Sequence, residues 1–90
     1  MTQRQYGADF LRAEAAAKQY PRTIHVNVAG LAVRAAANTA APLAGSQRLY
    51  VGDVFTAVGA VNGENVSGES RWWQSSLGHF VWSGGTTEKP

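Results

Sequence analysis

The chain has 90 residues, of which 44% are hydrophobic and 16% charged, so it allows a single domain and excludes wholesale disorder. It contains no cysteine, which excludes disulfides, thiolate nucleophiles and cysteine-ligated zinc. The net charge is only +2, and residues 22–88 contain four arginines and four acidic residues. This balance argues against a strongly basic surface that grips nucleic acid.

The sequence gives little sign of membrane insertion or export. No stretch approaches the ~18–20 apolar residues of a membrane span. Residues 1–5 are polar, and no apolar stretch of signal-peptide type follows them. We therefore expect either a protein that stays where it is made or a module of a larger secreted or phage-borne chain.

Residues 8–19 consist of good helix formers and predict one α-helix. Asp9 suits its first turn, and Pro21 ends it. A helix of about three turns is marginal in isolation, so Phe10 and Leu11 need a surface to pack on. Two interpretations remain open: the helix lies against the β-structure that follows, or it is the end of an inter-domain linker.

From residue 22 the helical pattern gives way to the alternation of β-strands. Residues 23–28 place three apolar side chains on one face, and residues 31–34 alternate again after Gly30. Residues 35–48 lack any period and contain Pro42 and Gly45. They predict a long loop, of a length that is often functional in a small domain.

The C-terminal half predicts several short strands. Residues 53–61 are rich in β-formers, and an Asn-Gly turn signal follows at 62–63. Residues 64–68 read as a connecting segment, and residues 69–75 and 79–83 as two further strands. Short strands with turn signals at close spacing predict an all-β sandwich or small barrel.

Four segments follow one another in an informative order. Residues 31–34 read Leu-Ala-Val-Arg, and residues 52–57 read Gly-Asp-Val-Phe-Thr-Ala. Residues 62–73 end in Arg-Trp-Trp, and residues 78–85 read Gly-His-Phe-Val-Trp-Ser-Gly-Gly. Together they resemble the bacterial SH3-like (SH3b) domain family over residues 23–86.

The resemblance implies an all-β fold, a small SH3-like barrel of five to six short strands over residues 22–87. Residues 1–21 would be an N-terminal tail with the short α-helix, and residues 88–90 a C-terminal tail. It also implies a non-catalytic module that binds peptidoglycan peptide or glycan in the cell envelope. Such modules accompany secreted or phage hydrolases, so a neighbouring catalytic domain is an expected partner.

Two adjacent tryptophans, Trp72 and Trp73, are the clearest candidates for a binding site. Neighbours in a strand point to opposite faces, and a barrel has only one inner face. We therefore expect one of them to be exposed, covered by the N-terminal helix or used in binding. Phe80 and Trp82 share a face of the last strand. We predict an outward aromatic cluster that contacts a peptide or glycan.

Three more residues are candidates for the edges of this groove. Tyr50 suits the solvent-exposed edge of the groove, because its hydroxyl favours contact with water. Asn62 and Glu64 belong to a polar turn that would line one end of the groove. The alternative is that all three are ordinary boundary or solvated positions. His25 and His79 lie at no metal-ligand spacing, so we predict neither a metal nor another cofactor.

Catalysis has little support in the sequence, which holds no nucleophile-elbow motif and no phosphate-binding loop. The main alternative to wall binding is a protein–protein module that holds a peptide, or a neighbouring domain of its own polypeptide, in the same groove. Nucleic-acid binding is disfavoured because the arginines are not clustered.

Overall fold

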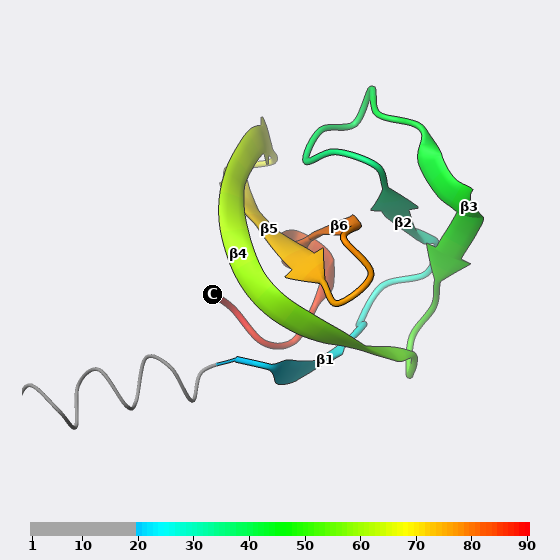
Figure 1. Cartoon of the computed structure of the whole chain (residues 1–90), viewed down its shortest axis with the longest axis vertical. Coiled ribbons are helices and arrows are strands. Elements are labelled where there is room, and N and C mark those ends of the chain that lie inside the picture. The colour runs from blue at the N-terminus through cyan, green and yellow to red at the C-terminus, as the bar shows by residue number, and fades with distance from the viewer. Residues whose placement is uncertain (1–19) are drawn as a thin grey trace, which may run out of the picture.

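The computed structural model describes residues 20–90, which form one antiparallel sheet of six strands (Figure 1). The elements are β1 (Arg22–His25), β2 (Leu31–Arg34), β3 (Leu43–Leu49), β4 (Val54–Val66), β5 (Glu69–Ser75), β6 (Phe80–Trp82) and the 3₁₀ turn η1 (Ser83–Gly85). Their order in the sheet is β1-β4-β5-β6-β2-β3, and β4 curves along the whole molecule. The prediction of an all-β fold is confirmed, whereas the helix predicted over residues 8–19 lies outside the described residues.

Strand β3 corrects the prediction of a loop over residues 35–48. β3 is an edge strand in which Leu49 is buried and both Gln47 and Arg48 are exposed. Buried and exposed positions therefore do not alternate at this end of the strand, and its sequence lacks the period of two. Gly45 adopts a φ of 61°, and the pairing of β2 with β3 shifts register between Ala32 and Arg34. A glycine in this conformation is typical of a β-bulge, which interrupts the period of two. The loop is therefore shorter and ends before β3 begins.

The β4–β5 hairpin turns later than the Asn-Gly pair predicts. Val66 pairs with Glu69, so Ser67 and Gly68 form a two-residue turn, with φ angles of 52° and 91°. Positive φ at both central residues is the geometry that matches the twist of hairpin strands. The predicted turn at 62–63 is wrong, and β4 continues through it.

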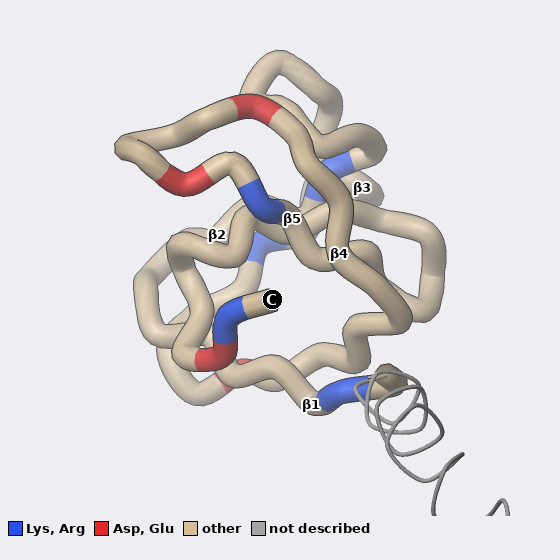
Figure 2. Tube along the Cα trace, turned by 90° about the vertical axis from the view of Figure 1, so that its left-hand side faces the viewer, with Lys and Arg blue, Asp and Glu red and all other residues tan. Residues whose placement is uncertain are grey.

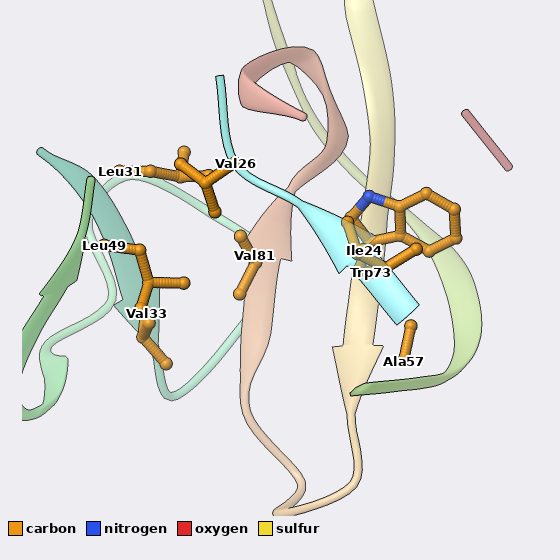
Figure 3. Close-up of a cluster of buried hydrophobic side chains, with 8 residues drawn as sticks. All are labelled: Ile24, Val26, Leu31, Val33, Leu49, Ala57, Trp73 and Val81. Atoms are coloured by element: carbon orange, nitrogen blue, oxygen red, sulfur yellow. The ribbon is translucent and has the colours of Figure 1, made fainter. Parts of the chain in front are cut away.

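The inner face of the curved sheet holds the main hydrophobic core (Figure 3). Its members come from several strands and from the segments beside them: Ile24, Val26, Leu31, Val33, Leu49, Ala57, Trp73 and Val81. Tyr20 meets the Trp73 indole edge-on at a centroid distance of 6.5 Å. The Arg22 guanidinium lies 5.0 Å from the centroid of the same ring, within the range of a cation–π contact.

The segment that follows β1 joins two distant parts of the chain. The Val26 N–H donates to the Asp53 carbonyl at 2.9 Å, and the Val26 carbonyl accepts from the Gly52 N–H at 3.2 Å. The Asn27 N–H donates to the Gly85 carbonyl at 3.0 Å. The β3–β4 turn and the end of η1 are therefore held on this one segment.

Candidate functional site

Both tryptophans of the β5 pair are buried, Trp72 with 1% and Trp73 with 0% of its surface exposed. Trp73 points into the inner core (Figure 3), and its Nε1–H donates to Thr86 Oγ1 at 2.9 Å. Trp72 lies on the opposite, outer face of the sheet, as alternation requires. Of the three alternatives expected for the pair, exposure is wrong, because the outer face has a cover of its own within residues 20–90.

The cover over Trp72 is built by the β4–β5 hairpin and the loop between β2 and β3. The Trp72 Nε1–H donates to the Glu64 carbonyl at 3.0 Å. The Glu64 N–H donates to the Ala37 carbonyl at 2.9 Å, and Glu64 Oε1 accepts both the N–H and the hydroxyl of Thr39 at 2.7 Å. A Cβ at Gly63 would lie 2.8 Å from the Trp72 ring, so only glycine allows this approach.

Trp82 extends the outer aromatic surface across the sheet. It pairs with Trp72 across β5 and β6, and Ala32 of the next strand pairs with Arg48 of β3. Opposite residues in paired strands lie on one face, so these side chains form a row. Trp82 is half-buried, and its Nε1–H donates to the Glu69 carbonyl at 3.0 Å.

A groove of about 190 Å³ opens on this face, and we call it the Trp82 groove. It is lined by residues 28–32, Arg34, Thr39, Arg48, Val66, Trp72 and Trp82. The half-buried Trp82 indole and the aliphatic side chains of Val28, Leu31 and Val66 give it an apolar wall, and Trp72 lies beneath this wall with 1% of its surface exposed. Two arginines and no acidic side chain among these lining residues give it a positive charge.

The two arginines of the Trp82 groove make different contacts. Arg34 Nη1–H donates to the Ala41 carbonyl at 2.7 Å and so holds the loop after β2. Arg48 is exposed, and its Nη1–H donates to the Gly30 carbonyl at 3.0 Å. Because a guanidinium has five N–H donors, both groups keep donors for a ligand.

Glu64 is ionised at neutral pH and lies beside the groove. The hydrogen bonds from the Thr39 backbone and then from its hydroxyl lower the pKa of the Glu64 carboxyl, and the charge of Arg34 adds to this. Its charge therefore offsets part of the charge of Arg34. Neither arginine forms an ion pair with an acidic side chain of residues 20–90.

The remaining sequence candidates are only partly brought to this site. Phe80 is half-buried and pairs with Arg34 on the outer face. Tyr50 is 54% exposed at the β3–β4 turn, and Asn62 is exposed on β4; neither lines the Trp82 groove. The structure thus brings Trp72, Trp82 and the Glu64 backbone together, and it leaves the other candidates apart.

Sequence reasoning missed the polar part of the groove, namely Arg34, Thr39 and Arg48. The described basic residues each lie in a different element, so nothing along the chain marks them as a cluster (Figure 2). A signal existed for Arg48 only if β3 had been predicted as the partner of β2. Its pairing with Ala32 then places it on the face of Arg34.

A second groove, of about 200 Å³, lies between β3 and the start of β4. The core residues Val33, Leu49 and Val81 line it, together with the more exposed Val54 and Leu77. Leu77 is 77% exposed, the largest value among the exposed large hydrophobic residues of the described part of the chain. Apart from His79, no titratable side chain lines this groove.

Within residues 20–90, no three His, Cys, Asp or Glu side chains gather closely enough to hold a metal ion. The same part of the chain has no helix long and apolar enough to cross a membrane. A scan against protein-family models found no match. Searches of curated proteins and of solved structures found no match either.

Proposed function

We propose that this chain is a non-catalytic SH3-like binding module that holds peptidoglycan peptide or glycan in the Trp82 groove. The supporting observation is that groove itself, which combines an indole wall with two guanidinium groups. Aromatic rings offer contact area at a small entropic cost, and arginines add directional hydrogen bonds. Both groups are held by neighbouring strands, so the groove exists before a ligand arrives.

Closure of the sheet into an SH3-like barrel belongs to the same proposal. It is supported by the Val26 segment, whose hydrogen bonds connect β1 to the turn after β3. The short η1 turn after β6 and the order of the family-like segments also fit a bacterial SH3 domain.

Sedimentation with purified peptidoglycan tests the binding function. We expect the chain to sediment with walls and Ala29→Trp to abolish this, because Ala29 is an exposed lining residue and a bulky ring there fills the groove. Val58→Trp is the matched control, since Val58 is 46% exposed and lines neither groove. Absence of sedimentation with walls of several bacterial types would contradict the proposal.

The second candidate function is binding of a peptide segment from a partner or a neighbouring domain. The second groove favours it, because its apolar lining continues into the exposed Val54 and Leu77. Leu77→Ser should weaken such binding and leave sedimentation with peptidoglycan unchanged. Loss of wall binding in Leu77→Ser would instead place the wall ligand in the second groove.

A further inference from the structure

The lining of the Trp82 groove combines two unlike kinds of side chain. Trp82 presents a half-buried indole ring, and Val66 an aliphatic side chain. Arg34 and Arg48 present guanidinium groups, and no acidic residue lines the groove. A ligand that matches both kinds of side chain carries an apolar part and a negative charge.

Arg48 is the cation with more capacity for such a ligand. Arg34 donates to the Ala41 carbonyl, and the nearby Glu64 carboxylate offsets part of its charge. Arg48 is exposed and makes one hydrogen bond, to the Gly30 carbonyl. Its remaining N–H donors form the planar fork that binds a carboxylate through two parallel hydrogen bonds.

The size of the groove limits the length of the ligand. Its volume of about 190 Å³ is below the roughly 300–1,000 Å³ of pockets that enclose drug-sized molecules. It therefore suits one or two residues of a peptide rather than a folded partner. A peptide end supplies a carboxylate and a small apolar side chain within that length.

We infer that the Trp82 groove selects peptides that carry a free carboxylate, and that Arg48 is the residue that determines this specificity. This inference rests on the binding function proposed above and names the chemical class of its ligand. Arg34 is a positioning residue, which holds the loop after β2 against the groove.

Titration with a matched pair of short peptides tests the inference. The probes are acetyl-Ala-Ala with a free C-terminal carboxylate and the same peptide as its carboxamide. Binding is followed through the NMR signal of the Trp82 indole N–H. We expect the acid to bind about tenfold more tightly than the amide, as one charge-assisted hydrogen-bonded pair allows.

Variants of Arg48 assign this preference. Arg48→Gln should bind acid and amide equally while its affinity for the amide stays unchanged, and Arg48→Lys should keep part of the preference. Lys89→Gln is the charge control, because Lys89 is exposed and lines neither groove. Lys89 Nζ–H donates to the Ser83 and Thr86 carbonyls at 2.8 Å, so urea unfolding of this variant accompanies the titration. Equal binding of both peptides by the parent chain, no binding of either, or a preference that survives in Arg48→Gln would overturn the inference.

Peptidoglycan whose carboxyl groups have been converted to amides separates this inference from the proposed function. Loss of sedimentation on amidation, with sedimentation on untreated walls, supports both. Equal sedimentation with both materials supports wall binding and contradicts carboxylate selection. A preference for the acid peptide without any wall binding would keep the selection and refute the wall as its source.

Discussion

The benzene ring of Trp82 lies against Gly84 in η1, and a Cβ at that position would collide with three atoms of the ring. The indole has little freedom to retreat, because its Nε1–H is bonded to the Glu69 carbonyl. We predict that Gly84→Ala lowers the free energy of unfolding by about 1–3 kcal/mol, the usual cost of overpacking. It should also weaken ligand binding in the Trp82 groove. Urea unfolding and peptide titration measure the two effects.

Gly59 provides the matched control for this substitution. It lies in β4 without a positive φ, and the nearest atom to an added Cβ is Gln74 Oε1 at 3.9 Å. Gly59→Ala should leave stability unchanged or raise it slightly, because glycine in a strand costs about 0.5–1 kcal/mol relative to alanine. Equal losses in both variants would show that the Trp82 ring does not rest on Gly84.

For single residues, the sequence predicts which face of the sheet a side chain points to better than it predicts whether that side chain is exposed. Alternation along β5 correctly placed Trp72 and Trp73 on opposite faces. Burial of Trp72 depends on Glu64 of the same hairpin and on Thr39, which lies in a loop distant in sequence and bonds to Glu64. The hydrophobic pattern along β5 does not show which other segments cover Trp72, so the pattern alone could not decide whether the aromatic cluster is exposed.

Among the secondary-structure elements, the position of the turn in the β4–β5 hairpin can be tested by substitution. Ser67 occupies a φ of 52°, a region that costs a residue with a Cβ about 1–2 kcal/mol. We predict that Ser67→Gly raises the unfolding free energy by up to about 1 kcal/mol, since glycine adopts positive φ freely. Asn62→Gly should instead lower it by about 0.5–1 kcal/mol, because Asn62 lies within a strand. The reverse order in urea unfolding would move the turn to residues 62–63.

Strand prediction succeeded for β2 and β5 and failed where the pairing is irregular. The bounds of both strands were predicted to the residue: burial alternates along β2, whereas β5 buries the adjacent Trp72 and Trp73 and follows the connecting segment that ends at Gly68. The edge strand β3 has a bulge at Gly45, and the Asn-Gly pair gave a stronger turn signal than Ser67 and Gly68. The first error comes from the irregular pairing of β3 with β2, and the second from the pairing of β4 with β5 on both sides of residues 62–63; each pairing overrides a local preference.

The contact between the β4–β5 hairpin and the loop after β2 should weaken in acid. Hydrogen bonds from the Thr39 backbone and hydroxyl lower the pKa of Glu64 below 4.5. A carboxyl with a depressed folded pKa contributes stability above its unfolded pKa and loses it as the pH falls through its folded value. We therefore predict a decline in melting temperature below about pH 4.5 that is smaller in Glu64→Gln.

Thr39→Val is the control for this acid dependence. It removes the hydroxyl bond to Glu64 and keeps the backbone bond, so its decline in melting temperature should lie between those of the parent and Glu64→Gln. The same decline in melting temperature at low pH in the parent and in Glu64→Gln would contradict the assignment of this decline to the contact between Thr39 and Glu64.

At the scale of the whole molecule, the C-terminal segment connects strands that are distant in sequence. The Thr87 N–H donates to the His25 carbonyl at 2.9 Å, and the His25 N–H donates to Glu88 Oε1 at 2.7 Å. Arg22 Nη1–H donates to the Lys89 carbonyl at 3.1 Å. Burial opposes ionisation of Glu88, but the hydrogen bonds from His25 outweigh it and lower the pKa of this carboxyl. Residues 88 and 89 therefore hold β1 in place at neutral pH.

The bond from Trp73 Nε1–H to Thr86 Oγ1 links this segment to the core, between two side chains with 0% exposure. Thr86→Val keeps the shape and leaves a buried donor without its acceptor, so we predict a loss of about 1–3 kcal/mol in unfolding free energy. In a Trp73→Phe background this donor is already gone, so the same substitution should cost less, and the cost that remains comes from the bond that the Thr86 hydroxyl donates to the Ser83 or Glu88 carbonyl. Thr87→Val, at an exposed position, should change stability by less than about 0.5 kcal/mol. If Thr86→Val costs as much in the Trp73→Phe background as in the parent chain, the coupling between Trp73 and Thr86 is absent, and the cost comes from the bonds that the Thr86 hydroxyl donates to carbonyls.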